Sequence, residues 1–204
     1  MKNQLLCDIG NTTFSFNDGR KAFVDDFDIS SIKEDVYYIS VNQYWEKRLS
    51  MQENWINLRS FVNCKKYYKS MGIDRIMACE AVDSAIVIDA GSAITVDLVK
   101  DSVHEGGYIY PGLVALAKCY KEISPALEVS FNFDIDLAKM PKNTEDALTY
   151  GAIAPLLSNI REISTELPVY LTGGDAERLL SFLPTATISH DLVFKGMKKL
   201  LEEH

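Results

Sequence analysis

The sequence predicts an α/β protein made of two similar halves, residues 1–83 and 84–204, each a sheet with flanking helices. Ala85–Val99 (AIVIDAGSAITVDLV) passes from an apolar, β-branched segment through Asp89 and Gly91 into a second such segment, which indicates strand, turn, strand. Leu5–Phe16 (LLCDIGNTTFSF) has the same order, so Asp8 corresponds to Asp89 and Gly10 to Gly91. The alanine-rich segment 76–83 is typical of a helix and places the boundary near residue 83.

The first half is expected to begin with three successive strands within residues 2–29. Asn17-Asp18-Gly19 supplies a hairpin turn between two of them. Three further segments have weaker signals: a buried strand at Val36–Ser40, a possible helix within residues 43–54, and a strand-like segment at Phe61–Tyr68.

In the second half, a long amphipathic helix is predicted from Thr144, with Asn143 or Thr144 as its cap. Gly151 and Pro155 within it predict a close helix contact and a kink. The other expected elements are a turn at Asp101-Ser102, a segment at Val103–Tyr110, a helix at Leu113–Ile123, a strand at Pro168–Leu171, and helices at Ala176–Phe182 and Asp191–Leu201.

Composition excludes several classes of protein. With 204 residues, 47% hydrophobic and 25% charged, the chain is typical of a globular protein. A net charge of -8 argues against nucleic-acid or anionic membrane binding, although glycine amides and a metal can still hold a small anion. The sequence contains neither an apolar run of membrane-spanning length nor a signal-peptide pattern at its start. Cys7, Cys64, Cys79 and Cys119 form no CxxC pair and three lie in apolar segments, so we expect reduced core thiols and a cytoplasmic location.

The first candidate site is the segment Asp8–Thr13 (DIGNTT). Amides of Gly10, Asn11 and Thr12 are suited to cradling phosphates, and Asp8 is suited to holding Mg²⁺. The alternative is a plain hairpin in which Asp and Asn are turn formers, and taken alone the motif favours that alternative slightly.

The second candidate, Asp89–Ala93, has the same plain alternative. Two equivalent Asp-Gly turns, 81 residues apart, are a stronger signal than either alone. If the halves pack with pseudo-symmetry, the turns face each other across a cleft and grip a nucleoside triphosphate. Thr172-Gly173-Gly174 further along the chain adds a third glycine turn to this set.

The third candidate is Gly72-Ile73-Asp74-Arg75. On spacing alone, an Asp beside an Arg is most often a helix cap with a solvated ion pair. The functional alternative makes Asp74 the base for a substrate hydroxyl and Arg75 the planar, bidentate anchor for a substrate carboxylate.

Together these motifs resemble a known family. DIGNT, GIDR, DAGSAIT, GGYIYPG, NTEDA and LTGG occur in the order and spacing of the type III pantothenate kinases, which belong to the actin-like ATPase superfamily with two ribonuclease-H-like halves. The resemblance covers nearly the whole chain. It implies mixed sheets flanked by helices, an active cleft between the halves, and ATP-dependent phosphorylation of pantothenate to 4'-phosphopantothenate, the first step of coenzyme A biosynthesis.

The resemblance also implies residue roles. Asp74 is the proton acceptor, and Asp89 binds a monovalent cation, potassium or ammonium, alongside Mg²⁺ that arrives with ATP. The family is homodimeric, with the substrate pocket completed by Thr144 of the second subunit. The implied ATP contacts are Asp8, Ile9, Gly10, Asn11, Thr12, Thr13, Phe14, Ser15 and Ser92, and the implied substrate contacts are Tyr68, Gly72, Ile73, Asp74, Arg75 and Thr144.

The chain departs from the family pattern in three respects. Ser92 stands where the family usually has Thr, which keeps the hydroxyl. The segment before GIDR is shortened, so Tyr68 is the expected substrate contact and Tyr67 its rival. The chain is also short for the family, which we expect to reflect trimmed loops. Two other functions stay open: another actin-like phosphotransferase or phosphatase, and a non-enzymatic nucleotide-binding regulator.

Overall fold

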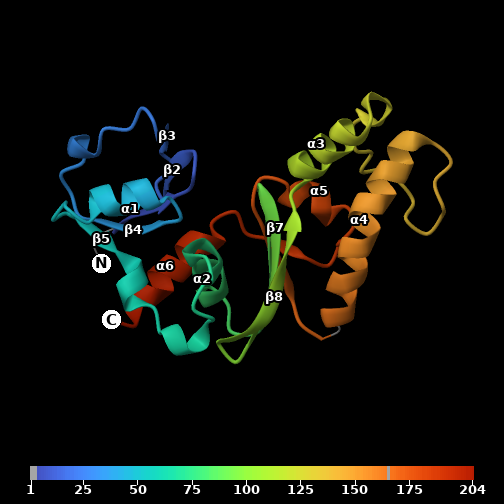
Figure 1. The fold of residues 1–204 in the computed structure, drawn as a ribbon. Helices are drawn as coiled ribbons and strands as arrows, with labels where there is room; N and C mark the ends of the chain where they lie inside the picture. The colour runs from blue at the N-terminus through green and yellow to red at the C-terminus, as the bar shows by residue number, and fades with distance from the viewer. Residues whose placement is uncertain (1–3, 165) are drawn as a thin grey trace. The chain divides into compact units, whose positions relative to one another are not determined.

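The computed structural model describes residues 4–164 and 166–204, which form two compact units, each built on a five-stranded sheet (Figure 1). The first unit contains the chain up to Asp83 together with Asp191–His204, and the second unit contains Ser84–His190. The predicted α/β class, with two mixed sheets flanked by helices, is confirmed.

The sheet of the first unit has the strand order β3-β2-β1-β4-β5. The hairpins β1–β2 and β2–β3 are antiparallel, whereas β4 is parallel to both β1 and β5. Gly19, with φ of 92°, closes the predicted turn between β2 and β3. The strands are β1 (Leu5–Ile9), β2 (Thr13–Phe16), β3 (Lys21–Phe23), β4 (Val36–Ser40) and β5 (Trp55–Asn57).

The second unit repeats this arrangement, in the order β8-β7-β6-β9-β10. Two antiparallel hairpins are again followed by two parallel neighbours. Asp101 and Ser102, both with positive φ, form the predicted two-residue turn between β7 and β8. The repeat that the two Asp-Gly segments predicted is therefore present in the topology. The strands are β6 (Ala85–Ala90), β7 (Ala93–Lys100), β8 (Val103–Pro111), β9 (Val169–Thr172) and β10 (Thr187–Ile188).

The helices of the first unit include the last helix of the chain, α6. We expected residues 84–204 to form one half, but α6 packs against α2 and β1 and so belongs to the first unit. The physical reason is Gly196, whose missing side chain allows the α6 backbone to approach the Met77 carbonyl of α2. The helices here are α1 (Gln43–Leu49), α2 (Ile73–Glu80) and α6 (Leu192–Glu202), with short 3-10 turns η1 (Ile29–Ser31), η2 (Leu58–Phe61) and η3 (Cys64–Lys66).

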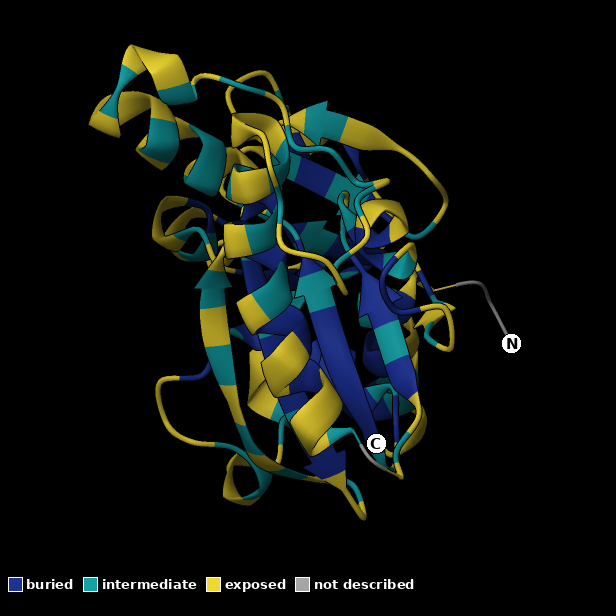
Figure 2. Ribbon diagram, turned by 90° about the vertical axis from the view of Figure 1, so that its right-hand side faces the viewer, coloured by how far each residue is buried: buried dark blue, intermediate teal, exposed yellow. Residues whose placement is uncertain are grey.

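The second unit contains α3 (Leu113–Ile123), η4 (Pro125–Leu127), α4 (Thr144–Ile163) and α5 (Ala176–Leu180). Ala152, Leu156 and Ile160 of α4 are fully buried against the sheet, as the amphipathic pattern predicted. Figure 2 shows dark-blue strands inside and yellow positions on the outer sides of the helices. The predicted close contact at Gly151 is absent from the described residues, because Gly151 is exposed and a methyl group there would lie 3.7 Å from the nearest atom, the Tyr120 hydroxyl.

One local prediction for the first unit was wrong. Phe61–Tyr68 is not a strand, because the Asn57 and Asn63 side chains accept hydrogen bonds from the amides two residues later and bend the backbone into η2 and η3. Cys64 lies in this segment and is exposed.

The cysteine prediction holds only in part. Cys7 and Cys79 are buried, whereas Cys64 and Cys119 are exposed, and all four are free thiols. Burial raises the pKa of the Cys7 thiol, which keeps that core thiol protonated. Within the described part of the chain, no helix is long and apolar enough to cross a membrane.

Candidate active site

The turn after β1 carries the first predicted phosphate-binding residues. Asp8 is half-buried near the end of the strand, and the Gly10 amide donates to the Thr13 carbonyl at 3.0 Å, which closes the turn. Asn11 and Thr12 are exposed at its tip. Ile9 and Phe14 have no exposed surface because their side chains belong to the core. The side chains of these two residues therefore support the turn from the core and do not reach a nucleotide.

The second unit has the equivalent turn after β6. The Gly91 amide donates to the Ala93 carbonyl at 3.0 Å, as the Gly10 amide does in the first unit, and Ser92 is exposed at the tip. Gly112, the N-cap of α3, packs directly on this turn, since a methyl group there would lie 2.7 Å from the Ser92 carbonyl carbon. At Pro111-Gly112, where β8 ends and α3 begins, the main chain therefore passes directly against the Gly91-Ser92 turn.

The Thr172-Gly173-Gly174 turn lies beside Asp89. Asp89 and Thr172 are register partners in adjacent strands, and the Asp175 amide donates to the Ala90 carbonyl at 2.9 Å. Gly173 has φ of 89°, and a methyl group on it would collide with the Asp89 carboxylate and the Ala90 carbonyl. The Asp89 carboxylate and the Ala90 carbonyl oxygen therefore lie close to Gly173, where no larger residue fits. Such hard oxygen donors are the ligands that alkali and alkaline-earth cations prefer.

Gly72–Arg75 forms the N-terminus of α2. Gly72 is the N-cap, and Asp74 accepts a hydrogen bond from the Arg75 amide on Oδ1 at 2.8 Å. A methyl group on Gly72 would lie 2.5 Å from that same oxygen. The glycine therefore leaves the space that the Asp74 carboxylate occupies. Ile73 is buried and anchors the turn in the core.

The Arg75 guanidinium is held against Tyr68. Arg75 is 7% exposed, its Nη1 donates to the Tyr68 hydroxyl at 2.7 Å, and its guanidinium carbon lies 5.8 Å from the centre of the Tyr68 ring. Tyr68 itself is 46% exposed. Solvent therefore reaches the Tyr68 ring beside the arginine.

Tyr67, the rival tyrosine, is tied to a different group. Burial, followed by the charge and hydrogen bond of the Glu80 carboxylate, raises the pKa of Tyr67 well above its ordinary value. The Tyr68 hydroxyl accepts a hydrogen bond from the Arg75 side chain, as the expected substrate contact requires.

Thr144 lies at the start of α4, where Asn143 is the cap that accepts from the Asp146 amide at 2.8 Å. Thr144 is exposed and lines a shallow hollow of about 410 Å³ with Leu127, Leu148 and their neighbours.

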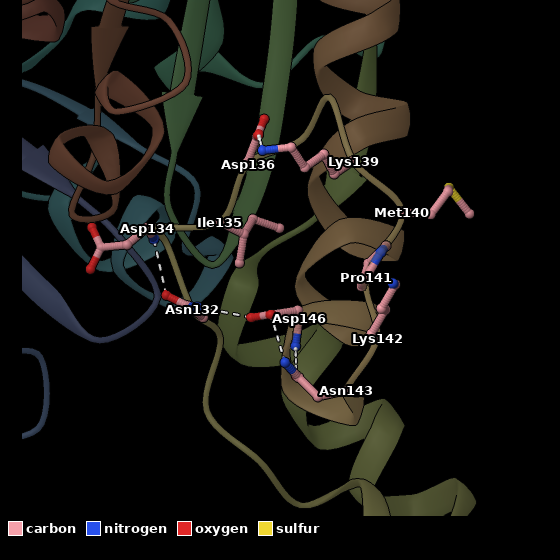
Figure 3. A pocket seen from close by; sticks show the side chains of 10 residues that line it. All are labelled: Asn132, Asp134, Ile135, Asp136, Lys139, Met140, Pro141, Lys142, Asn143 and Asp146. Carbon is pink, nitrogen blue, oxygen red and sulfur yellow. Dashed lines mark hydrogen bonds and ion pairs between the residues drawn. The ribbon is translucent and has the colours of Figure 1, made fainter.

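Figure 3 shows the adjoining pocket of about 330 Å³, where the Asp146 carboxylate accepts from the Asn132 and Asn143 side-chain amides at 2.8 and 2.7 Å. Asn132 had no distinguishing signal in the sequence, because residues 129–140 lack periodicity and the residue acts through a loop.

The predicted site residues divide between the units. Asp8–Ser15, Tyr68 and Gly72–Arg75 lie in the first unit, whereas Asp89, Ser92 and Thr144 lie in the second. Within the second unit, Asp89, Ser92 and the two glycine turns gather at one end of the sheet. Thr144 comes from the separate loop before α4.

Comparison with known proteins identifies this architecture. A solved structure of a putative 2-dehydro-3-deoxygalactonokinase from Sinorhizobium meliloti matches 98% of this chain and 96% of its own with a TM-score of 0.57 at 11% identity, a likeness of fold alone. A structure from Campylobacter jejuni, described as a conserved putative Baf family transcriptional activator, matches with a TM-score of 0.89 at 38% identity over 98% of both chains. The fold is of the actin-like ATPase and sugar-kinase class.

The family is narrower than this class. The model of the type III pantothenate kinase family matches residues 26–166. A type III pantothenate kinase from Sulfurimonas denitrificans is 50% identical over 202 residues, which span 98% of each chain. The chain therefore belongs to the type III pantothenate kinase family.

Proposed function

We propose that this protein transfers the γ-phosphoryl group of ATP to the primary hydroxyl of pantothenate, giving 4'-phosphopantothenate for coenzyme A biosynthesis. The observation that carries the proposal is the 50% identity over nearly the full length with a type III pantothenate kinase. Phosphoryl transfer depends mainly on positioning and charge stabilisation, so the geometry of polar groups is the relevant support.

Asp74 is proposed as the base that accepts the hydroxyl proton. Its Oδ1 is already engaged by the Arg75 amide, and within the described part of the chain Oδ2 accepts no hydrogen bond. This arrangement fixes the carboxylate while leaving one oxygen for the substrate hydroxyl, which is the geometry that a general base requires.

Arg75 and Tyr68 are proposed to bind the pantothenate carboxylate. The guanidinium is planar, permanently charged and nearly buried, so its attraction for a carboxylate is weakly screened. The Tyr68 hydroxyl accepts from Arg75 and lies beside the guanidinium, so a carboxylate bound to Arg75 would also meet the tyrosine ring.

The glycine turns are proposed to bind ATP. Main-chain amides of the Asp8–Ser15 segment suit the phosphates, with Asp8 near the Mg²⁺ that accompanies ATP, and the exposed Ser92 hydroxyl supplies a further contact. Asp89, whose carboxylate lies beside Gly173 and the Ala90 carbonyl oxygen, is proposed to bind a monovalent cation such as potassium. A bound cation there would offset part of the phosphate charge.

A homodimer is the proposed assembly, with Thr144 reaching the pocket of the second subunit. Thr144 is exposed beside a hollow, as a residue serving another subunit must be. Light scattering of the purified protein measures this assembly directly.

The test is a coupled ADP-release assay with pantothenate, run with potassium and again with sodium. We expect pantothenate-dependent turnover that potassium stimulates. Asp74→Asn should keep the fold and ligand binding while losing roughly 10²- to 10⁴-fold in kcat, the usual contribution of a general base. Asp25→Asn, at an exposed loop position, is the matched control. Near-wild-type turnover of Asp74→Asn would exclude Asp74 as the base.

The Campylobacter jejuni structure is described as a transcriptional activator, which favours one alternative, a regulator without kinase activity. Calorimetric ATP binding combined with no turnover on pantothenate or related alcohols would support that alternative. Turnover on another alcohol, without turnover on pantothenate, would indicate a different phosphotransferase.

A further inference from the structure

The segment Lys66–Tyr68 is tied to α2 at two points. At the N-terminal end of the helix, Arg75 donates to the Tyr68 hydroxyl at 2.7 Å. At the C-terminal end, Glu80 accepts from the Lys66 ammonium group at 3.3 Å. Glu80 lies five positions after Arg75 in the helix, a rise of about 7.5 Å, so the segment runs alongside the helix.

Glu80 is a buried carboxylate, only 3% exposed, and two consecutive residues interact with it. The second is Tyr67, whose hydroxyl forms a hydrogen bond to the Glu80 side chain. Tyr67 has extended backbone dihedrals of -136° and 153° at the end of η3. The neighbouring side chains of Tyr67 and Tyr68 can therefore reach different points on α2.

A buried ion pair is a weak source of stability, because desolvation offsets the Coulomb attraction. Its better-attested use is to select one conformation over others. Lys66–Tyr68 belongs to none of the β-strands among the described residues, so no sheet ladder fixes its backbone. Its backbone is held by single turn hydrogen bonds at either end, from the Lys66 amide to the Asn63 carbonyl and from the Met71 amide to the Tyr68 carbonyl, and the Glu80 contacts add side-chain bonds between them.

We propose that Glu80 is a positioning residue for substrate binding: by holding Lys66 and Tyr67, it sets the backbone so that the Tyr68 hydroxyl meets the Arg75 guanidinium. The inference rests on the proposed function in one respect, that Tyr68 and Arg75 bind the substrate carboxylate. The chain thereby uses Tyr67 as an anchor and Tyr68 as a ligand contact.

The kinetic test compares Tyr67→Phe, Glu80→Gln and Lys66→Gln with the wild type. We expect the KM for pantothenate to rise roughly fivefold to tenfold, the effect of losing about one hydrogen bond in a binding site, with kcat and the KM for ATP within twofold of wild type. Lys66→Arg keeps the ion pair and should restore a near-wild-type KM. Tyr38→Phe is the matched control, because it also removes a buried hydroxyl, one that contacts Asn57, from the first unit.

A second measurement reads the positioning without turnover. In a crystal structure of Tyr67→Phe, we expect the Tyr68 hydroxyl to have moved away from Arg75. The proposal is overturned if that contact stays at 2.7 Å. It is also overturned if Tyr67→Phe and Lys66→Gln lower the melting temperature, as we expect of Tyr38→Phe, without raising the KM for pantothenate. It is equally overturned if kcat falls instead of KM rising. Absence of turnover in the wild type would instead contradict the proposed function, and the crystal structure would still decide the positioning.

Discussion

Gly196→Ala tests whether the close approach of α6 to α2 holds the first unit together. A methyl group at this position would lie 2.7 Å from the Met77 carbonyl carbon, nearer still to its oxygen, and 3.2 Å from the Ala81 amide. Ordinary contacts of a methyl carbon begin near 3.4 Å. The atoms that this methyl group would meet belong to the main chain of Met77 and Ala81. A change of side-chain rotamer cannot move them, so the two helices must separate.

Two opposing effects set the change in the free energy of unfolding of Gly196→Ala. Overpacking by one methyl group in a rigid contact typically costs 1–3 kcal/mol, and separating the helices also weakens the dispersion contacts of buried neighbours such as Met197 and Leu200. Alanine recovers about 1 kcal/mol because it favours helix over glycine. Since the contact is with main-chain atoms, we take the upper end and expect a net loss of about 2 kcal/mol, or roughly 4–8 °C in melting temperature.

Gly151→Ala in α4 is the matched control. It makes the same substitution within a helix, but its methyl group would lie 3.7 Å from the nearest atom and the position is exposed. We expect a gain of up to about 1 kcal/mol from helix propensity alone. Calorimetric melting of both variants at equal concentration, with light scattering to compare their association states, measures the difference between the two effects.

One result would refute the reasoning. If Gly196→Ala raised the melting temperature as much as Gly151→Ala, the close approach of α6 to α2 would not exist in the folded protein. The assignment of α6 to the first unit would then have no support from this glycine.

Three further predictions concern the site. Gly72→Ala should displace the Asp74 carboxylate and lower kcat at least tenfold, with circular dichroism unchanged. Gly173→Ala should crowd Asp89 and abolish potassium stimulation in the ADP-release assay, whereas an unchanged potassium titration would place the cation elsewhere. Because the raised pKa of Tyr67 favours its neutral form in the fold, its contribution to stability is complete below about pH 10 and lost as pH rises further. Melting between about pH 8 and 11 should thus fall less steeply for Tyr67→Phe.

Much of the fold was predictable because its strongest signals are local. Two Asp-Gly turns between β-branched segments were sufficient to predict the repeated hairpins, and the stripe of Ala152, Leu156 and Ile160 was sufficient for α4. The short edge strands β5 and β10, with three and two residues, left no periodic pattern to detect. The strand predicted at Phe61–Tyr68 was wrong because the side chains of Asn57 and Asn63 compete with a sheet for backbone amides.

The site was predictable to a similar extent. The family resemblance selected Gly72–Arg75, which spacing alone would have left as a helix cap. Only the three-dimensional structure showed that Tyr68 contacts the Arg75 side chain, because Tyr67 and Tyr68 are adjacent and chemically alike. The role of Glu80 depends on a contact with Lys66, 14 residues earlier in the chain, which no local pattern encodes. The packing of α6 against α2 and β1 could not be predicted from the sequence for the same reason.

Because α6, at the end of the chain, packs in the first unit, the order in which the two units can fold on the ribosome changes. Residues 84–190 form one continuous stretch, whereas the first unit is interrupted and lacks α6 until residues 191–204 emerge from the ribosome. The usual N-terminal-first order of cotranslational folding is then reversed, since the unit whose residues are made first is completed last. Until α6 is made, the mostly apolar face of α2 that packs against it stays exposed to solvent. We expect this face to be the main site at which a chaperone binds the nascent chain.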